Sequence, residues 1–257
     1  MTVTELLQSP AKDLLNIYFT AGYPHLDSLC ELLPALEAAG ADLVEIGIPY
    51  SDPLSDGPTI QQSSAHALAN GISLELIFKQ LEETTTQIPK VMMGYFNTVL
   101  QFGFERFCQR CADTGISGVI LPDLPIELYL DRYASLFEQH GLSNIFLVTP
   151  ETPADRLHYI DQHSTSFIYA VSSSSTTGVK AGIQDAAPYL KGLQTAKLKT
   201  PFLVGFNIAS PKDFDFACQY ARGGIIGSAF IRYLAKQNDL HAATTQFVQH
   251  IRQLQLS

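Results

Sequence analysis

Apolar residues along the chain fall into two kinds of segment. Short continuous apolar runs, typical of strands buried on both faces of a parallel sheet, recur eight times. They lie at 14–20, 42–48, 90–94, 117–121, 144–148, 166–171, 201–204 and 223–226. Between them, apolar residues recur at the i, i+3, i+4 spacing of amphipathic helices. The clearest such segments cover 28–39, 73–85 and 239–254.

This pattern predicts the α/β fold class. Eight strands alternating with helices in 257 residues are typical of a (β/α)8 TIM barrel, and we expect one barrel domain over residues 1–257. We also expect a short extra N-terminal helix at 2–9 and extra short helices after strands 2 and 8. Thr152-Pro153 and Ser210-Pro211 predict helix starts, because a capping side chain precedes a proline suited to the first helical turn.

A doubly wound open sheet is the main rival architecture. It would be expected to carry a glycine-rich turn after its first strand, where this chain reads Thr20-Ala-Gly-Tyr-Pro. A rough internal repeat favours the barrel instead. Segments 39–47 and 113–123 each combine a helix end, a glycine and a buried strand with an acid at its end.

Charge and cysteine usage narrow the possible partners and compartment. A net charge of −9 without any run of Lys or Arg argues against nucleic-acid and anionic membrane surfaces. No apolar stretch approaches the roughly 18 residues of a membrane span, and the first residues do not resemble a signal peptide. The 4 cysteines fit a reducing compartment, so we expect a cytoplasmic protein. Cys108 and Cys111 have CxxC spacing, but we favour helix packing over redox chemistry because they lie late in an amphipathic segment.

Glu45 is a carboxylate inside the otherwise apolar run 43–48. A charge buried in a strand costs free energy unless it is paired or used. Strand alternation puts Glu45 on the face opposite Val44 and Ile46, and we interpret its face as the barrel interior. Glu45 is therefore a candidate catalytic residue, with a salt-bridged structural glutamate as the alternative.

A stiff acidic loop follows this strand. It contains Pro49, Pro53 and Pro58 together with Asp52 and Asp56. Asp56 precedes a glycine, so it is either a turn former or a second catalytic acid. We interpret Asp52 as bracing the loop.

Other candidates come from the predicted carboxyl ends of strands, where barrel enzymes place their active residues. These ends include Tyr18, Tyr95 and Tyr169. The segment 172–182 is polar and long for a strand–helix connection, which indicates either a linker or an active-site lid; its position favours the lid.

The last two strands are followed by glycine-containing turns. They read Val204-Gly-Phe-Asn207 and Ile226-Gly-Ser228, and loops at these places commonly hold phosphate in such barrels. Ordinary turn glycines are the alternative interpretation. No lysine stands at an inward strand end, which argues against Schiff-base chemistry. The 7 histidines form neither HxH nor HExxH, so we expect no metal site. Two carboxylates beside an anion pocket indicate acid–base chemistry on a phosphorylated substrate.

The stretch from Glu45 to Gln61 resembles the signature of the tryptophan synthase alpha chain family. It reads Glu-Ile-Gly-Ile-Pro-Tyr-Ser-Asp-Pro-Leu-Ser-Asp-Gly-Pro-Thr-Ile-Gln. The resemblance extends over nearly the whole chain in family order. Its further matches are Phe19-Thr-Ala-Gly-Tyr-Pro, Gly94-Tyr-Phe-Asn, Leu121-Pro-Asp-Leu-Pro, Thr176-Thr-Gly, Val204-Gly-Phe and Gly227-Ser-Ala.

The resemblance implies a lyase of L-tryptophan biosynthesis. Its reaction is the retro-aldol cleavage of indole-3-glycerol phosphate to indole and D-glyceraldehyde 3-phosphate, with no cofactor in this chain. It implies Glu45 as the proton shuttle and Asp56 as the acceptor of the indole N–H. It implies an indole pocket and active-site tyrosine at Tyr18, Tyr95 and Tyr169, phosphate contacts at Gly178, Gly205, Gly227 and Ser228, and a lid contact at Thr177.

The sequence departs from the family pattern in two places. Ser175 and Thr176 stand where the commoner lid motif has Gly-Val, which bears on how the lid closes. Asn207 replaces the last glycine of Gly-Phe-Gly beside the expected phosphate, although asparagine tolerates positive φ better than most residues.

The resemblance also implies a partner. Family members pair with a beta chain that carries pyridoxal phosphate, in an alpha2beta2 heterotetramer. Two other functions stay open from the residues: an isomerase of a sugar phosphate, which would not explain the Asp56 loop, and a catalytically silent subunit that only binds phosphate, against which Glu45 and Asp56 argue.

Overall fold

One sheet of parallel strands organises the chain. The computed structural model describes residues 1–54, 56–172 and 182–253, and within them the sheet has nine strands. They are β1 (Leu14–Thr20), β2 (Leu43–Gly47), β3 (Lys90–Met93), β4 (Ile116–Ile120), β5 (Ser143–Asn144), β6 (Leu147–Val148), β7 (Ile168–Val171), β8 (Phe202–Gly205) and β9 (Gly223–Ile226). Their order in the sheet is β5-β4-β3-β2-β1-β9-β8-β7-β6.

The sheet closes through a strand that changes partners. β5 and β6 stand at opposite ends of the sheet order, but only Ile145 and Phe146 separate them in the chain. The Ile145 N–H donates to the Val119 carbonyl over 2.9 Å, and the Phe146 carbonyl accepts from the Tyr169 N–H over 2.9 Å. The sheet therefore curls onto itself as a barrel, which confirms the predicted fold class. The single strand predicted at 144–148 is wrong, because its two halves pair with different neighbours.

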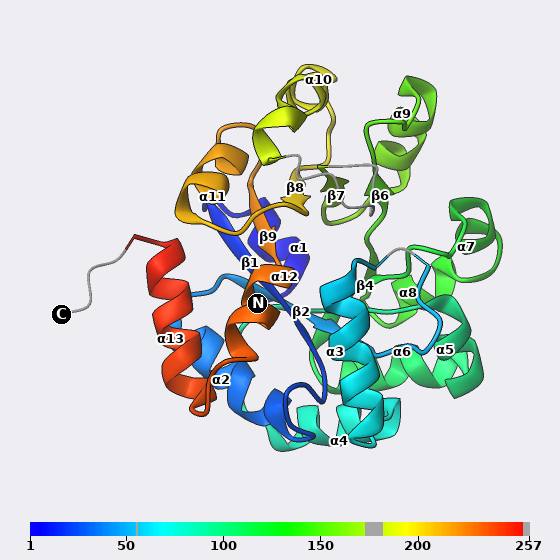
Figure 1. Cartoon of the computed structure of the whole chain (residues 1–257). Helices are drawn as coiled ribbons and strands as arrows, with labels where there is room; N and C mark the ends of the chain where they lie inside the picture. The colour runs from blue at the N-terminus through cyan, green and yellow to red at the C-terminus, as the bar shows by residue number, and fades with distance from the viewer. Residues whose placement is uncertain (55, 173–181, 254–257) are drawn as a thin grey trace.

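Helices cover the outside of the barrel (Figure 1), and the first helix packs against the interior at the amino-terminal end of the barrel. They are α1 (Val3–Gln8), α2 (Ser28–Ala39), α3 (Pro58–Ala69), α4 (Leu74–Glu83), α5 (Phe96–Phe102), α6 (Phe104–Asp113), α7 (Ile126–Arg132), α8 (Ala134–Gln139), α9 (Ala154–His163), the 3-10 turn η1 (Ile183–Ala186), α10 (Ala187–Thr195), α11 (Pro211–Cys218), α12 (Ser228–Leu234) and α13 (Leu240–Ile251). The last helix, α13, packs beside α2, so the final helix covers the start of the barrel. No helix among these described residues is long and apolar enough to cross a membrane.

The extra helices lie where the sequence predicts them. α1 precedes the barrel, and α3 follows β2. α12 follows β9, which is the eighth of the predicted strands, 223–226. Ser210 caps α11 as predicted, since its side chain accepts from the Asp213 N–H and Pro211 stands in the first turn. The predicted cap at Thr152 is wrong: α9 begins at Ala154 after Pro153, and the Thr152 hydroxyl instead accepts from the Thr149 N–H.

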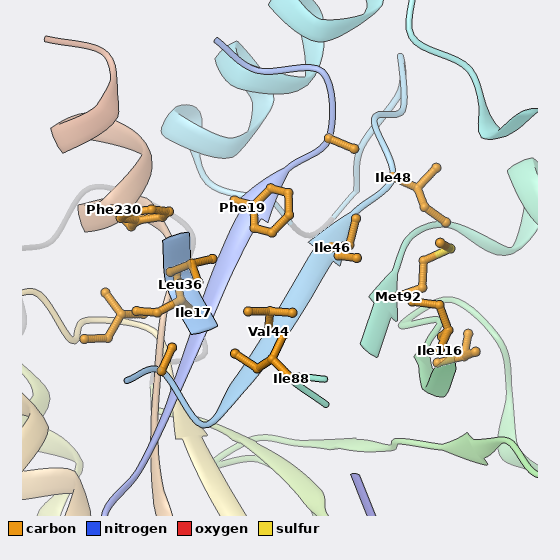
Figure 2. Packing of buried hydrophobic residues seen from close by; sticks show 14 of the residues in the cluster. Ile17, Phe19, Leu36, Val44, Ile46, Ile48, Ile88, Met92, Ile116 and Phe230 are labelled. Atoms are coloured by element: carbon orange, nitrogen blue, oxygen red, sulfur yellow. The ribbon is translucent and has the colours of Figure 1, made fainter. Parts of the chain in front are cut away.

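The larger apolar cluster lies between the sheet and the helices. Strand alternation sends every second side chain outward into this layer. Figure 2 shows outward residues of β1 and β2, among them Phe19, Val44 and Ile46, packed near Leu36 of α2 and Phe230 of α12. This confirms the predicted orientation of Val44 and Ile46.

The smaller apolar cluster fills the barrel interior. Inward residues such as Leu14, Leu43 and Val91 belong to it, together with Val3 and other apolar residues of α1. The Val3 N–H donates to the Ser117 hydroxyl over 2.9 Å, which fixes α1 against β4. α1 therefore packs against the first inward residues of the strands and leaves the carboxyl ends of the strands for a site.

Candidate active site

A cavity of about 430 Å³ opens at the carboxyl ends of the strands. Strand ends, the loop before α3 and the start of α12 supply its walls, so residues far apart in the sequence meet there. Predicted site residues on its lining are Tyr18, Asp56, Tyr169, Asn207, Gly227 and Ser228. This is the end of a barrel at which enzymes of this fold build their active sites.

Glu45 lies inside the barrel beside this cavity, not on its lining. The Glu45 residue is 0% exposed, and the Asn16 side-chain amide donates to Glu45 Oε1 over 2.6 Å. Glu45 Oε2 has no hydrogen-bond partner among the residues that the structure describes. Burial raises the pKa of Glu45 to about 8, and the Asn16 hydrogen bond opposes this rise. No ion pair involves Glu45 within the described ranges, which removes the salt-bridged alternative.

Two tyrosines lie near Glu45: half-buried Tyr18 on β1 and buried Tyr169 on β7. Tyr18 pairs in register with Glu45 across β1 and β2, and Tyr169 projects inward from β7. Each hydroxyl occupies the space that a glycine leaves empty. A Cβ on Gly47 would lie 2.1 Å from Tyr18 Oη, and a Cβ on Gly205 would lie 2.2 Å from Tyr169 Oη. Burial raises the pKa of both phenols, so both stay uncharged at neutral pH.

Tyr95 holds the loop that carries Asp56. Its hydroxyl accepts from the Leu54 N–H over 3.1 Å and donates to Asp56 Oδ2 over 3.0 Å. The Tyr95 ring also stacks on Tyr50, with ring centroids 4.9 Å apart. Burial raises the pKa of Asp56, and the Tyr95 hydrogen bond opposes this rise. Tyr95 is therefore placed behind Asp56, and Asp56 is placed on the cavity wall.

The turns after β8 and β9 form the opposite wall. Phe206 and Asn207 both adopt positive φ, at 69° and 57°, so Asn207 occupies a backbone conformation that favours glycine. Gly227 precedes α12, and Ser228 opens it without a side-chain cap on its first amides. Gly227 and Ser228 therefore present uncapped backbone N–H groups near the cavity, an arrangement suited to an anion.

The remaining predicted residues lie elsewhere. Tyr95 and Gly205 are adjacent to lining residues but not on the lining itself. Thr177 and Gly178 lie outside the described residues, as do Ser175 and Thr176, so their expected roles stay predictions. Cys108 and Cys111 are both 0% exposed in α6, and burial raises the pKa of Cys108 to about 12, which favours the packing interpretation. Over the part of the chain that the structure describes, no His, Cys, Asp and Glu group could hold a metal ion.

Comparison with known proteins decides the family. The family model described as tryptophan synthase alpha chain matches residues 5–256. The chain belongs to the tryptophan synthase alpha chain family. A tryptophan synthase alpha chain of Flavobacterium psychrophilum is 49% identical over 88% of this chain and 90% of its own length. One from Christiangramia forsetii is 46% identical over 98% of both chains. Family membership makes the chain an enzyme subunit of tryptophan biosynthesis.

Solved alpha-chain structures agree with this fold. The alpha chain of Legionella pneumophila superposes with a TM-score of 0.83 at 34% identity, covering 98% of this chain and 95% of that one. A chain of the tryptophan synthase complex of Pyrococcus furiosus gives a TM-score of 0.84 at 29% identity, covering 95% and 99%.

Two residues of this alpha chain were missed from the sequence. Asn16 contacts Glu45. In the sequence it could have been noticed as a polar residue inside the apolar run 14–20, on the same strand face as Tyr18. Arg232 lies on the cavity lining and donates to the Thr59 hydroxyl over 3.2 Å. It is the one cationic side chain among the described lining residues. In the sequence, Arg232 stands one helical turn after Ser228, a spacing that puts both residues on one face of a helix. This can be recognised only when the start of that helix is known.

Proposed function

We propose that this alpha chain cleaves indole-3-glycerol phosphate to indole and D-glyceraldehyde 3-phosphate. The observation that carries the proposal is the pair of carboxylates, Glu45 and Asp56, both with raised pKa, at one end of a barrel beside a cavity with an anion-suited wall. Carboxylates with shifted pKa values around a pocket are typical of sites for acid–base catalysis. Family membership supplies the substrate.

Glu45 acts as the proton shuttle in this proposal. With a pKa of about 8, it is mostly protonated at neutral pH and can donate to indole C3. The bond between C3 and the glycerol chain then breaks, and its electron pair returns to the indole ring. Glu45, now a carboxylate, takes the proton of the neighbouring hydroxyl, whose oxygen becomes the aldehyde carbonyl. Glu45 thus ends the cycle in its starting form.

Asp56 takes the second role. Protonation of C3 places positive charge on the indole nitrogen, and a carboxylate that accepts its N–H would stabilise that charge. Asp56 lies on the cavity wall and is held by Tyr95, which fits this role. The rings of Tyr18 and Tyr169, both on the cavity lining, suit an aromatic substrate on its flanks.

The phosphate takes the wall formed by the turns after β8 and β9. Gly227 and Ser228 offer backbone N–H groups and a hydroxyl, while Asn207 and Arg232 lie on the same lining. We also assign Gly205, Thr177 and Gly178 to this end, on the family resemblance alone. Residues of this kind bind a dianion despite the net charge of −9.

The proposal includes the partner and the compartment. We propose that the chain needs no cofactor of its own and pairs with a tryptophan synthase beta chain carrying pyridoxal phosphate, in the cytoplasm, as an alpha2beta2 heterotetramer. In support, a similar solved chain comes from a tryptophan synthase complex of Pyrococcus furiosus.

The test is turnover by the purified chain. Incubation with indole-3-glycerol phosphate should release indole, measured by chromatography, and added beta chain should raise the rate. Absence of indole with and without the beta chain would reject the lyase and favour the silent phosphate-binding subunit. Calorimetric binding of glycerol 3-phosphate then separates that subunit from a chain with no site.

A further inference from the structure

Asn16 and Glu45 make a polar contact inside the barrel, below the cavity. Asn16 and Glu45 are each 0% exposed, and 2.6 Å separates Asn16 Nδ2 from Glu45 Oε1. The other inward residues at this depth, such as Leu14 and Leu43, are apolar and belong to the interior cluster. Asn16 is thus the direct neighbour of the carboxylate on the side away from the cavity.

The register explains how the contact forms. Asn16 pairs with Leu43 and Tyr18 pairs with Glu45, so Asn16 lies one inward position nearer the amino end of β1. Glu45 therefore reaches back along the barrel axis to the Asn16 amide. Asn16 is not itself on the cavity lining, although its register partner Ile225 is, so its direct polar link to the site is the contact with Glu45.

Asn16 is costly as a structural residue. Among the described residues, its buried Oδ1 has no hydrogen-bond partner. A buried polar atom left unpaired destabilises the fold, and a leucine of similar branched shape would avoid that cost at Oδ1. A purely structural role therefore favours an apolar side chain here.

We propose that Asn16 is a positioning residue for Glu45: it anchors Oε1 in the barrel interior and leaves Oε2, which has no partner in the described part of the chain, as the oxygen that transfers protons. This inference rests on the proposed function and deepens it. An amide suits a proton shuttle because it serves both forms of the acid. Its N–H donates to Oε1 in both forms, because the protonated acid carries its proton on Oε2 and keeps Oε1 as an acceptor.

The titratable groups near Glu45 allow the effect of Asn16 on the titration of Glu45 to be measured separately from theirs. Tyr18 on β1 and Tyr169 on β7 are the titratable neighbours, and Asp56 faces these same two hydroxyls. The phenols are uncharged over the working range, so Asn16 is the main hydrogen-bonding influence on Glu45 titration. Since the Asn16 bond favours the carboxylate, its loss should move Glu45 titration to higher pH.

Three variants test the proposal in the full chain. Asn16→Leu removes the amide, and Asn16→Asp keeps the shape but sets a second carboxyl against Glu45. Asn144→Leu is the matched control: Asn144 is also a buried strand asparagine, 3% exposed, on β5, three strands from β2. Each is assayed for kcat and KM against pH, and Glu45 titration is followed by carbon-13 NMR of the carboxyl groups.

Both Asn16 variants should lower kcat by about tenfold or more, with KM changed less than about threefold, because the lost bond involves a charged group. The high-pH fall of activity and the Glu45 titration should both move to higher pH. Asn144→Leu should move neither. A folded Asn16→Leu or Asn16→Asp chain with wild-type kcat, pH profile and Glu45 titration would overturn the proposal. A wild-type chain that releases no indole rejects the lyase instead, and the NMR titration still decides whether Asn16 controls Glu45.

Discussion

Glu45 lies on a strand and Asp56 on a loop, and the two carboxylates are held by different means. The backbone of Glu45 is fixed on both sides by the pairing of β2 with β1 and β3, and its side chain contacts Asn16 in the interior. Asp56 has no sheet around it; a hydroxyl from Tyr95 and a side chain from Gln61, which donates to its carbonyl, hold it in place.

Burial acts differently on the two acids. Glu45 is fully buried and its pKa rises to about 8, whereas partly exposed Asp56 is raised less far. The pair therefore has an acid that keeps its proton at neutral pH and a second acid that loses its proton first. Such divergence between two carboxylates is how one site can supply both an acid and an anion.

Replacing Glu45, the acid on the strand, by glutamine tests its role as the proton shuttle. Glu45→Gln should lower kcat for indole release by about 10³-fold, within the range for a lost general acid–base group. Substrate binding should survive, because the phosphate wall is untouched. The measurement is single-turnover indole release together with glycerol 3-phosphate affinity; wild-type release in the variant would contradict the role of Glu45.

The same substitution should stabilise the fold at high pH. The folded pKa of Glu45, about 8, lies above the unfolded value of 4.5, so the native state binds the extra proton between these values. Stability from this group is complete below pH 4.5 and is lost as pH rises through 8. Glu45→Gln should therefore exceed wild type by a few kcal/mol at pH 8, on the order of 4, and by little at pH 4.5. Urea unfolding at both pH values measures this, and an equal gain at both would contradict the buried acid.

Asp56 is expected to matter less than Glu45. Asp56→Asn should reduce kcat by about 10²-fold, the loss typical of one electrostatic contact in a transition state. Wild-type activity should rise with pH as Asp56 ionises, above the ordinary range of an aspartate, and fall near pH 8 as Glu45 loses its proton. The Asp56→Asn variant should lose the rise of activity at low pH and keep the fall of activity near pH 8. A pH–rate profile for kcat/KM that retains both limbs would assign the rise to another group.

The hydrogen bond from Tyr95 to Asp56 allows a more selective test of the acid on the loop. Tyr95→Phe keeps the ring on Tyr50 and removes the donor to Asp56. Because that bond favours the carboxylate, the activity rise at low pH should move to higher pH and kcat should fall by about tenfold. The high-pH fall, set by Glu45, should stay where it is; movement of both limbs would mean that the two acids are not separately controlled.

Arg232 should have the smallest effect. Arg232→Gln removes the cation from the phosphate wall but leaves the backbone N–H groups of Gly227 and Ser228. An exposed charge interaction is worth little, so KM should rise by about threefold with kcat unchanged. Steady-state kinetics at low and high salt checks this, since the KM difference should shrink with added salt.

The comparison also shows what could be predicted from sequence. The face of Glu45 follows from strand alternation alone, since Val44 and Ile46 must turn toward the helices. Its contact with Asn16 depends on the register between β1 and β2, which a pattern within one strand does not contain. The Tyr95–Asp56 bond depends on the path of an irregular loop, so only the family resemblance suggested that both residues belong to one site.

The split fifth strand lay beyond prediction for a related reason. Residues 144–148 form one apolar run, and periodicity treats it as one strand. The change of partner at Ile145 and Phe146 depends on how the curled sheet closes, a property of the whole ring.

That closure gives the barrel a seam. Most of the ring is held by longer ladders, such as β1 with β2, but β4 with β5 and β6 with β7 share two residue pairs and one flanking bond each, and β8 with β9 share one pair. A closed cylinder opens most cheaply where the fewest bonds must break together. The joints with the fewest paired residues therefore all lie between β4 and β9, whereas β1 to β4 form the best-paired part of the ring. Glu45 lies in this firmly paired part, whereas the turns of the proposed phosphate wall follow β8 and β9, which share one pair.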